Sequence, residues 1–274
     1  MGKITASEVN NLRKMSGAGI MDCKNALVES NGNFDIAIEI LRKKGQKVAA
    51  KRADRNSSEG AVIAKVDSKC LNGIIISLNC ETDFVAKNES FVALANQLAE
   101  LGLNYNSLED FLKSEIDSMT VSEKLIQQTG VIGEKLIIGS FEKLSAAYVG
   151  KYIHAGNKIA TLSGFSSSFD GIEETAKNIA MQAAAMNPIA LDESGVDQQT
   201  IDKEIEIAKD QLRQEGKPEA MLDNIAKGKL KRFFKDNTLV NQDFIKDNKL
   251  SISAYIKSIH SDLKITGFKR VSLV

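Results

Sequence analysis

The 274-residue sequence predicts an α+β fold, and three patterns support that prediction. Apolar residues recur at helical spacing through residues 1–54, which indicates three short helices. Residues 55–140 and 141–190 each show a strand, a second strand and then a helix, a weak repeat of architecture rather than of letters. Residues 191–235 carry two narrow apolar stripes on either side of a turn. We therefore expect a helical segment, two similar α+β core halves, the second completed by residues 236–274, and a helical hairpin.

The first expected helix has a clear start and end. Thr5 and Glu8 fit a capping box, in which each side chain accepts a hydrogen bond from the other residue's backbone N–H. The apolar face that follows comprises Val9, Leu12 and Met15. Gly17 should end this helix, because glycine disfavours helix interiors and readily adopts the turn conformation beyond them.

Two more helices complete residues 1–54. The second should carry Met21, Ala26 and Leu27, and Cys23 fits best as a small packing residue. The third should begin at Asn33 or Asp35 and stop at Gly45. Three helices in so short a segment make a small core, which is typical of an adaptor more than of an active-site scaffold.

The core halves are predicted from alternating and central apolar runs. In the first half we expect strands at 61–66, 74–78 and 135–141, and helices at 91–101 and 122–128. In the second half we expect strands at 146–156 and 158–165 and a helix at 171–185, with later strands in 237–245 and 264–274 that return to this half.

The hairpin prediction rests on two stripes that flank Gly216–Pro218. The first stripe comprises Ile201, Ile205, Ala208 and Leu212, and the second comprises Leu222, Ile225, Ala226, Leu230 and Phe233. Narrow stripes can seal two antiparallel helices against each other without a larger core.

Composition narrows the classes of function. The chain has 36 basic and 36 acidic residues, whereas proteins that bind nucleic acids or membrane surfaces usually have a basic excess. No apolar run approaches the roughly 20 residues of a membrane helix, and no signal-peptide core is present. The three cysteines, Cys23, Cys70 and Cys80, lack metal-ligand spacing and do not suggest a disulfide framework. We expect a reduced, cytoplasmic protein without a metal or cofactor.

Two basic clusters leave nucleic-acid contact open as an alternative. One comprises Lys51, Arg52 and Arg55, and the other comprises Lys227, Lys229, Lys231, Arg232 and Lys235. The favoured interpretation is that both clusters are solvated helix surfaces. Salt-sensitive RNA binding by an adaptor of this kind is the alternative.

Enzyme chemistry finds little support. The only histidines are His154 and His260, and neither an HExxH pattern nor a phosphate-binding loop occurs. Glu81 and Asp83 could form a carboxylate pair on one face of a strand, but no nucleophile or base accompanies them. An enzyme that uses this pair is therefore the less favoured alternative.

The segment CETDFVAK, residues 80–87, places Phe84 between Asp83 and Val85 just after an apolar strand. Residue type alone favours Phe84 as a core side chain, with Asp83 as a loop or capping residue. The opposite interpretation is that the aromatic ring is presented to another protein.

Several segments, taken in order, carry a family resemblance. ITASEVNNLRKMSGAGIMDCKNAL (4–27) and NCETDFVAKNESF (79–91) closely resemble the two signatures of bacterial elongation factor Ts, the guanine nucleotide exchange factor of elongation factor Tu. Weaker similarities lie at 131–136, 152–160, 214–221 and 227–234. The resemblance covers nearly the whole chain.

The resemblance implies a ubiquitin-associated-like N-terminal module, two similar core halves and a protruding antiparallel coiled-coil hairpin. It also implies a translation elongation factor that binds elongation factor Tu, most tightly without nucleotide, and promotes exchange of GDP for GTP by disturbing the magnesium and phosphate site. Such a factor has no catalytic residues, cofactor, membrane contact or direct nucleic-acid contact of its own.

The resemblance further implies three groups of partner-binding residues. Those at the partner's nucleotide site are Thr82, Asp83, Phe84 and Val85. Those on the N-terminal module are Arg13, Ile20, Met21, Asp22 and Lys24. His154 and Ile245 are candidates in the second half, although a lone histidine beside Gly156 is more often structural.

Overall fold

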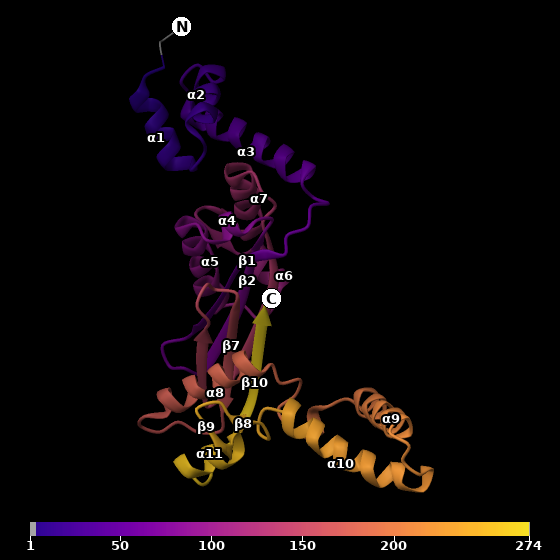
Figure 1. Ribbon diagram of the computed structural model, residues 1–274. Helices are drawn as coiled ribbons and strands as arrows, with labels where there is room; N and C mark the ends of the chain where they lie inside the picture. Colours follow the sequence, from indigo (N-terminus) through magenta and orange to yellow (C-terminus); the bar gives the residue numbers. More distant parts are fainter. Residues whose placement is uncertain (1–3, 274) are drawn as a thin grey trace. The chain divides into compact units, whose positions relative to one another are not determined.

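The computed structural model describes residues 4–273, and its ribbon is drawn in Figure 1. The mixture of helices with small sheets confirms the α+β class. The described residues divide into two compact units. The first unit comprises the residues up to Val62, together with Ile76–Phe141 and Leu273. The second unit comprises Ile63–Ile75 and Glu142–Ser272.

The first unit begins with the three expected helices, α1 (Ala6–Ser16), α2 (Ile20–Glu29) and α3 (Phe34–Lys51). The capping box is confirmed: Thr5 Oγ1 accepts from Glu8 N at 3.2 Å, and the Glu8 carboxylate accepts from Thr5 N at 2.7 Å. Gly17 adopts a left-handed conformation at the end of α1, and Asn33 caps α3 through Ile36 N. The small core of these helices contains Leu12, Cys23, Ala26, Leu27 and Ala37.

Helix α3 does not stop at Gly45, and the prediction that it would is wrong. The helix runs on to Lys51, and Gly45 lies against α7 (Val121–Ile132). A Cβ built on Gly130 of α7 would meet Gly45 Cα at 2.5 Å. The two glycines therefore allow the close approach of α3 and α7.

The elements from Glu59 to Ser145 follow the expected order with additions. They are β1 (Glu59–Val66), β2 (Asn72–Cys80), α4 (Asp83–Ala86), α5 (Glu89–Gly102), α6 (Leu108–Lys113), β3 (Glu115–Ile116), β4 (Met119–Thr120), α7 and β5 (Ile137–Ser145). Strands β1, β2 and β5 form a sheet in that order. The short elements α4, α6, β3 and β4 were not expected from the sequence, because none is long enough to show an apolar period.

The second unit is built on a three-stranded antiparallel sheet of order β10-β7-β6. Its strands are β6 (Tyr148–Ile153), β7 (Ile159–Phe165) and β10 (Ile265–Ser272), so the last strand does return to this half as expected. Helix α8 (Ile172–Met186) packs on the sheet. Thr161 Oγ1 and Ser163 Oγ donate to carbonyls of this helix at 2.6 and 2.9 Å, so their buried hydroxyls are satisfied.

The other elements of the second unit are η1 (Glu193–Gly195), α9 (Gln198–Gln214), α10 (Glu219–Asn237), β8 (Asp243–Phe244), β9 (Asp247–Ser251) and α11 (Ile252–Ile259). The strand expected in 237–245 is reduced to the two residues of β8. The preceding backbone instead bonds to a neighbouring loop, where Leu239 N donates to Ala190 O and Val240 N donates to Leu191 O.

Helices α9 and α10 lie side by side, in orange tones in Figure 1. Ala208, Leu212, Leu222 and Ala226 from the two predicted stripes are buried. Ion pairs flank this seam, with Lys209 Nζ 2.9 Å from Asp223 and Arg213 2.9 Å from Glu219. Across residues 4–273, no helix combines the length and the apolar character needed to cross a bilayer.

Candidate functional site

The segment after β2 folds into the four-residue helix α4. Thr82 is its N-cap residue, and Thr82 Oγ1 accepts a 3.4 Å hydrogen bond from Val85 N. Cys80 Sγ, at the end of β2, contacts Thr82 O at 3.2 Å. The cap explains why the helix begins at Asp83, soon after the end of the strand at Cys80. This chain path directs Ala86 into the interior and Phe84 away from it.

Phe84 is 83% exposed, more than any other large hydrophobic residue described. The expectation from residue type alone, that Phe84 belongs to the core, is therefore wrong. Asp83 precedes it at the start of α4 and pairs with Lys87 Nζ at 2.6 Å. Val85 is half-buried. The segment thus presents an aromatic ring and an adjacent carboxylate at the surface.

The carboxylate pair suggested by the sequence is not formed on a strand. Strand β2 ends at Cys80, so Glu81 follows it and Asp83 belongs to α4. Asp83 pairs with Lys87, whereas Glu81 is engaged by Arg52 and Lys135. The enzyme alternative required Glu81 and Asp83 on one face of a strand, and neither residue lies in a strand.

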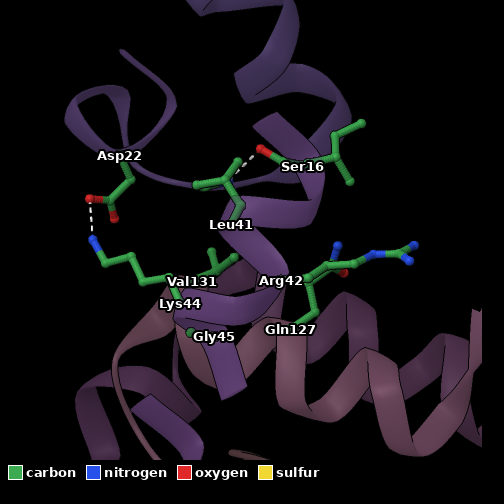
Figure 2. Close-up of a pocket in the computed structure, with 11 residues that line it drawn as sticks. Ser16, Asp22, Leu41, Arg42, Lys44, Gly45, Gln127 and Val131 are labelled. Carbon is green, nitrogen blue, oxygen red and sulfur yellow. Dashed lines mark hydrogen bonds and ion pairs between the residues drawn. The ribbon is translucent and has the colours of Figure 1, made fainter. Parts of the chain in front are cut away.

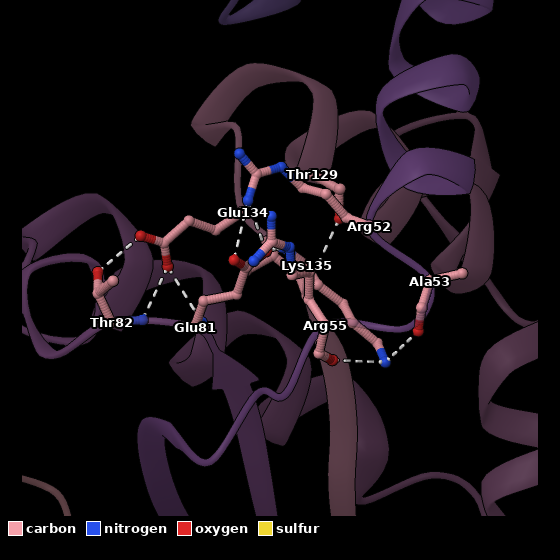
Figure 3. Close-up of polar contacts among 9 residues, drawn as sticks. Arg52, Ala53, Arg55, Glu81, Thr82, Thr129, Glu134 and Lys135 are labelled. Carbon is pink, nitrogen blue, oxygen red and sulfur yellow. Dashed lines mark hydrogen bonds and ion pairs between the residues drawn. The ribbon is translucent and has the colours of Figure 1, made fainter.

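Glu134 holds the start of α4 in place (Figure 3). One carboxylate oxygen accepts from both Glu81 N and Thr82 N at 3.0 Å. The other accepts from Thr82 Oγ1 at 2.6 Å. One side chain therefore satisfies two consecutive backbone donors and the capping hydroxyl. Sequence reasoning missed Glu134 because its partners lie 52 and 53 residues away.

Glu81 lies at the centre of a second set of contacts in Figure 3. Its carboxylate accepts 2.8 Å hydrogen bonds from Arg52 Nη1 and a 2.7 Å hydrogen bond from Lys135 N. Burial acts to raise the pKa of Glu81, but the Lys135 N–H and the Arg52 guanidinium outweigh it and leave the pKa below its ordinary value. Lys135 Nζ donates to the carbonyls of Ala53 and Arg55, so the segment after α3 is tied to the same cluster.

The candidates on the N-terminal helices lie around the start of α2. Ile20 and Met21 are 53% and 62% exposed, and Arg13 and Lys24 are also exposed. Asp22 is half-buried and pairs with Lys44 of α3, as Figure 2 shows, so it also braces α2. Arg13 lies in the last turn of α1, and the other four residues lie in the first part of α2.

Met15 departs from expectation in the same region. It was expected on the buried face of α1 but is 63% exposed. Its exposure adds a third apolar side chain to those of Ile20 and Met21. The sequence signal for this exposure was Gly17. It ends the helix two residues after Met15, so Met15 lies in the last turn, where the chain leaves the core.

His154 and Ile245 both belong to the second unit. His154 is exposed, and its Nδ1 lies 3.0 Å from the Tyr152 hydroxyl. Ile245 is 40% exposed, and its backbone N donates to Gln182 Oε1 at 2.9 Å. Each side chain is accessible at the surface of its own unit.

A hollow lies where α3 and α7 approach, drawn in Figure 2. Leu41, Gly45, Gln127 and Val131 are among the residues that line it. Its volume is about 30 Å³, whereas a larger hollow of about 500 Å³ opens beside α7 and β5, with Leu125, Leu136 and Ile138 among its lining residues. Within residues 4–273, no cluster of His, Cys, Asp and Glu side chains is arranged to hold a metal ion. The 83% exposed Phe84 on a helix that Glu134 anchors makes the α4 segment the candidate site.

Comparison with known proteins identifies the family of the chain. The family model described as Elongation factor TS matches residues 81–273, which include α4, Glu134 and both candidates of the second unit. The chain belongs to the elongation factor Ts family. Elongation factor Ts of Christiangramia forsetii and that of Flavobacterium psychrophilum are each 66% identical to it over 273 residues, with all of both chains covered. That of Amoebophilus asiaticus is 48% identical over 271 residues, with 98% of each chain covered.

Membership confirms the resemblance and places the chain among translation elongation factors. The full-length relatives also cover Arg13, Ile20, Met21, Asp22 and Lys24, which lie before the span of the family match. Both the α4 segment and the N-terminal candidates thus lie in parts of the chain that the family shares.

Proposed function

We propose that this chain binds elongation factor Tu and promotes the exchange of bound GDP for GTP. The observation that carries the proposal is the 83% exposed Phe84 on the anchored helix α4. Exposing a phenyl ring to water is unfavourable, so a ring held outward is suited to burial in a partner. Thr82 and Val85 hold the helix, while Asp83 and Phe84 contact the partner.

The target of α4 is the magnesium and phosphate site of the GTPase. GDP in such a site is held by backbone amides, and magnesium demands near-ideal octahedral geometry. Phe84 acts as a wedge that displaces the segment carrying the magnesium shell. Asp83 competes for donors that otherwise order that segment. The chain performs no covalent chemistry and needs no cofactor of its own.

Thermodynamic linkage determines the order of affinities. If the factor weakens GDP binding by some ratio, GDP weakens factor binding by the same ratio. The complex is therefore tightest when elongation factor Tu is free of nucleotide, and returning GTP or GDP expels the factor. Exchange is accelerated without a shift in its overall equilibrium.

The remaining candidates form the docking surfaces. Residues 1–54 form a ubiquitin-associated-like module that contacts the partner through Arg13, Ile20, Met21, Asp22 and Lys24. Residues 55–140 form one core half, and residues 141–190 with 236–274 form the other, which contributes His154 and Ile245. Residues 191–235 form a protruding antiparallel coiled-coil hairpin. The protein acts in the cytoplasm, without membrane or direct nucleic-acid contacts.

The proposal is tested by mixing the purified chain with elongation factor Tu that carries a fluorescent GDP analogue and excess unlabelled GDP. Substoichiometric amounts of the chain should accelerate release catalytically. Gel filtration should show a stable complex without nucleotide that dissociates when GDP is added. If release is unchanged and no complex forms, the proposed function is wrong.

A further inference from the structure

The orientation of Phe84 depends on contacts that Phe84 itself does not make. Its helix α4 has four residues, and isolated helices shorter than about 12 residues are marginal in water. Phe84 is 83% exposed, so burial of its own ring contributes little to the direction of α4. The direction is therefore set by Thr82 at the start of the helix, by the half-buried Val85 and by the buried Ala86 at its end.

Glu134 accepts from both the N–H and the hydroxyl of Thr82, while Cys80 Sγ contacts the Thr82 carbonyl. The Glu134 carboxylate accepts hydrogen bonds from Thr82 N at 3.0 Å, from Thr82 Oγ1 at 2.6 Å and from Glu81 N at 3.0 Å. Hydrogen bonds to an ionised acceptor are shorter and stronger than neutral ones. With its proton donated to Glu134, the Thr82 hydroxyl keeps its lone pairs for Val85 N, the first capping contact of α4.

Glu134 is itself held firmly. Gly133 ends α7 in the left-handed conformation with φ 81°, which turns the chain directly before Glu134. Thr129 secures both sides of this turn, because its carbonyl accepts from Gly133 N at 2.9 Å and its hydroxyl accepts from Leu136 N at 3.2 Å. The next residue, Lys135, donates its N–H to Glu81. Glu134 and Glu81 thus brace each other across the turn and the start of α4.

We infer that Glu134 is a positioning residue, which fixes the direction of α4 and so the presentation of Phe84. This inference rests on the proposed exchange function, to which it adds a residue that acts only through Phe84. A rival account is that Glu134 merely stabilises the fold. The two accounts differ because a positioning residue loses its influence on exchange once Phe84 is removed.

The test compares Glu134→Ala, Phe84→Ala and the double variant in release of the fluorescent GDP analogue at saturating factor. Glu134→Ala should lower the maximal release rate on the order of tenfold, less than the roughly hundredfold that a 1 Å misplacement of a reacting group can cost. In the Phe84→Ala background the same change should alter the rate less than twofold. An equal loss in both backgrounds would overturn the inference.

Two further variants separate positioning from stability. Glu134→Gln keeps an oxygen for the two backbone donors and an amide for the Thr82 hydroxyl, so it should restore most of the rate lost in Glu134→Ala. Glu123→Ala is the matched control, because Glu123 also accepts from the N–H and hydroxyl of a capping threonine, Thr120. It should leave the maximal rate unchanged. A loss in Glu123→Ala as large as that in Glu134→Ala would favour the purely structural role.

Amide hydrogen exchange on the free chain tests positioning without elongation factor Tu. In Glu134→Ala, the amides of residues 81–87 should exchange faster than in wild type, whereas Val92 of α5, bonded to Asn88 O, should be unchanged. Unchanged rates at 81–87 would overturn the inference. Faster exchange there, in a chain that does not accelerate GDP release, would retain the positioning role and reject the proposed function instead.

Discussion

Phe84 and Phe91 lie on neighbouring helices, α4 and α5, yet Phe84 is 83% exposed and Phe91 is 1% exposed. Phe84→Ala should therefore change the free energy of unfolding by no more than about 0.5 kcal/mol, as surface substitutions usually do. Phe91→Ala should lower it by about 3–5 kcal/mol, because it removes a buried ring and leaves a cavity. Chemical denaturation of both variants checks this pair. A large loss in Phe84→Ala would place its ring in the core.

Gly130 and Gly228 both lie inside helices, but their surroundings predict opposite effects of alanine. A Cβ on Gly130 would meet Gly45 Cα at 2.5 Å, so Gly130→Ala should force α3 and α7 apart and cost about 1–3 kcal/mol. Nothing lies within 4 Å of a Cβ on Gly228, so Gly228→Ala should stabilise α10 by about 0.5–1 kcal/mol. A denaturation midpoint that rises in Gly130→Ala would contradict the close α3–α7 contact, and one that falls in Gly228→Ala would contradict the open surroundings of Gly228.

Glu81 should make stability depend on pH in one direction. Its pKa is lowered in the folded chain, because hydrogen bonds from Lys135 N and Arg52 outweigh the opposing effect of burial. Its stabilising contribution is therefore fully present above its unfolded pKa of about 4.3, and it is lost as pH falls from there through the folded pKa. Urea denaturation between pH 7 and pH 3 should give wild type a higher free energy of unfolding than Glu81→Gln. This difference should narrow on acidification below about pH 5. If the difference in unfolding free energy widens on acidification, the pKa of Glu81 is not lowered by folding.

Met21 tests the proposed docking surface of the N-terminal helices. Its side chain is 62% exposed, so Met21→Ser should leave the fold intact and remove apolar area from the interface. The affinity for nucleotide-free elongation factor Tu should fall about tenfold, equivalent to about 1.4 kcal/mol. Ile259→Ser in α11, at a position 44% exposed, is the control and should bind like wild type. Equal affinity of both variants, measured by calorimetry, would remove Met21 from the docking surface.

The sequence predicted those features of the fold that depend on residues close to one another in the chain. The capping box of Thr5 and Glu8 and the cap at Asn33 depend on partners three residues away, so the sequence could predict them. The apolar stripes of α9 and α10 were predicted for the same reason, because helical periodicity is visible within one segment.

Failures occurred where a distant segment determines the outcome. Gly45 resembles a residue that ends a helix, but it lies inside α3 and allows the close approach of Gly130 on α7. Phe84 resembles a core residue, but its exposure follows from the direction of α4, which the distant Glu134 anchors. Residue type could not predict either outcome. The family motif did direct attention to Phe84, but it offered no physical reason for its exposure.

The most direct test of the central claim is the release of a fluorescent GDP analogue from elongation factor Tu, compared between wild type and Phe84→Ala at equal, substoichiometric concentrations. The account predicts catalytic acceleration by wild type and a marked loss of acceleration in the variant, whose unfolding free energy should be unchanged. Equal acceleration by both proteins would contradict the role of Phe84 as the wedge.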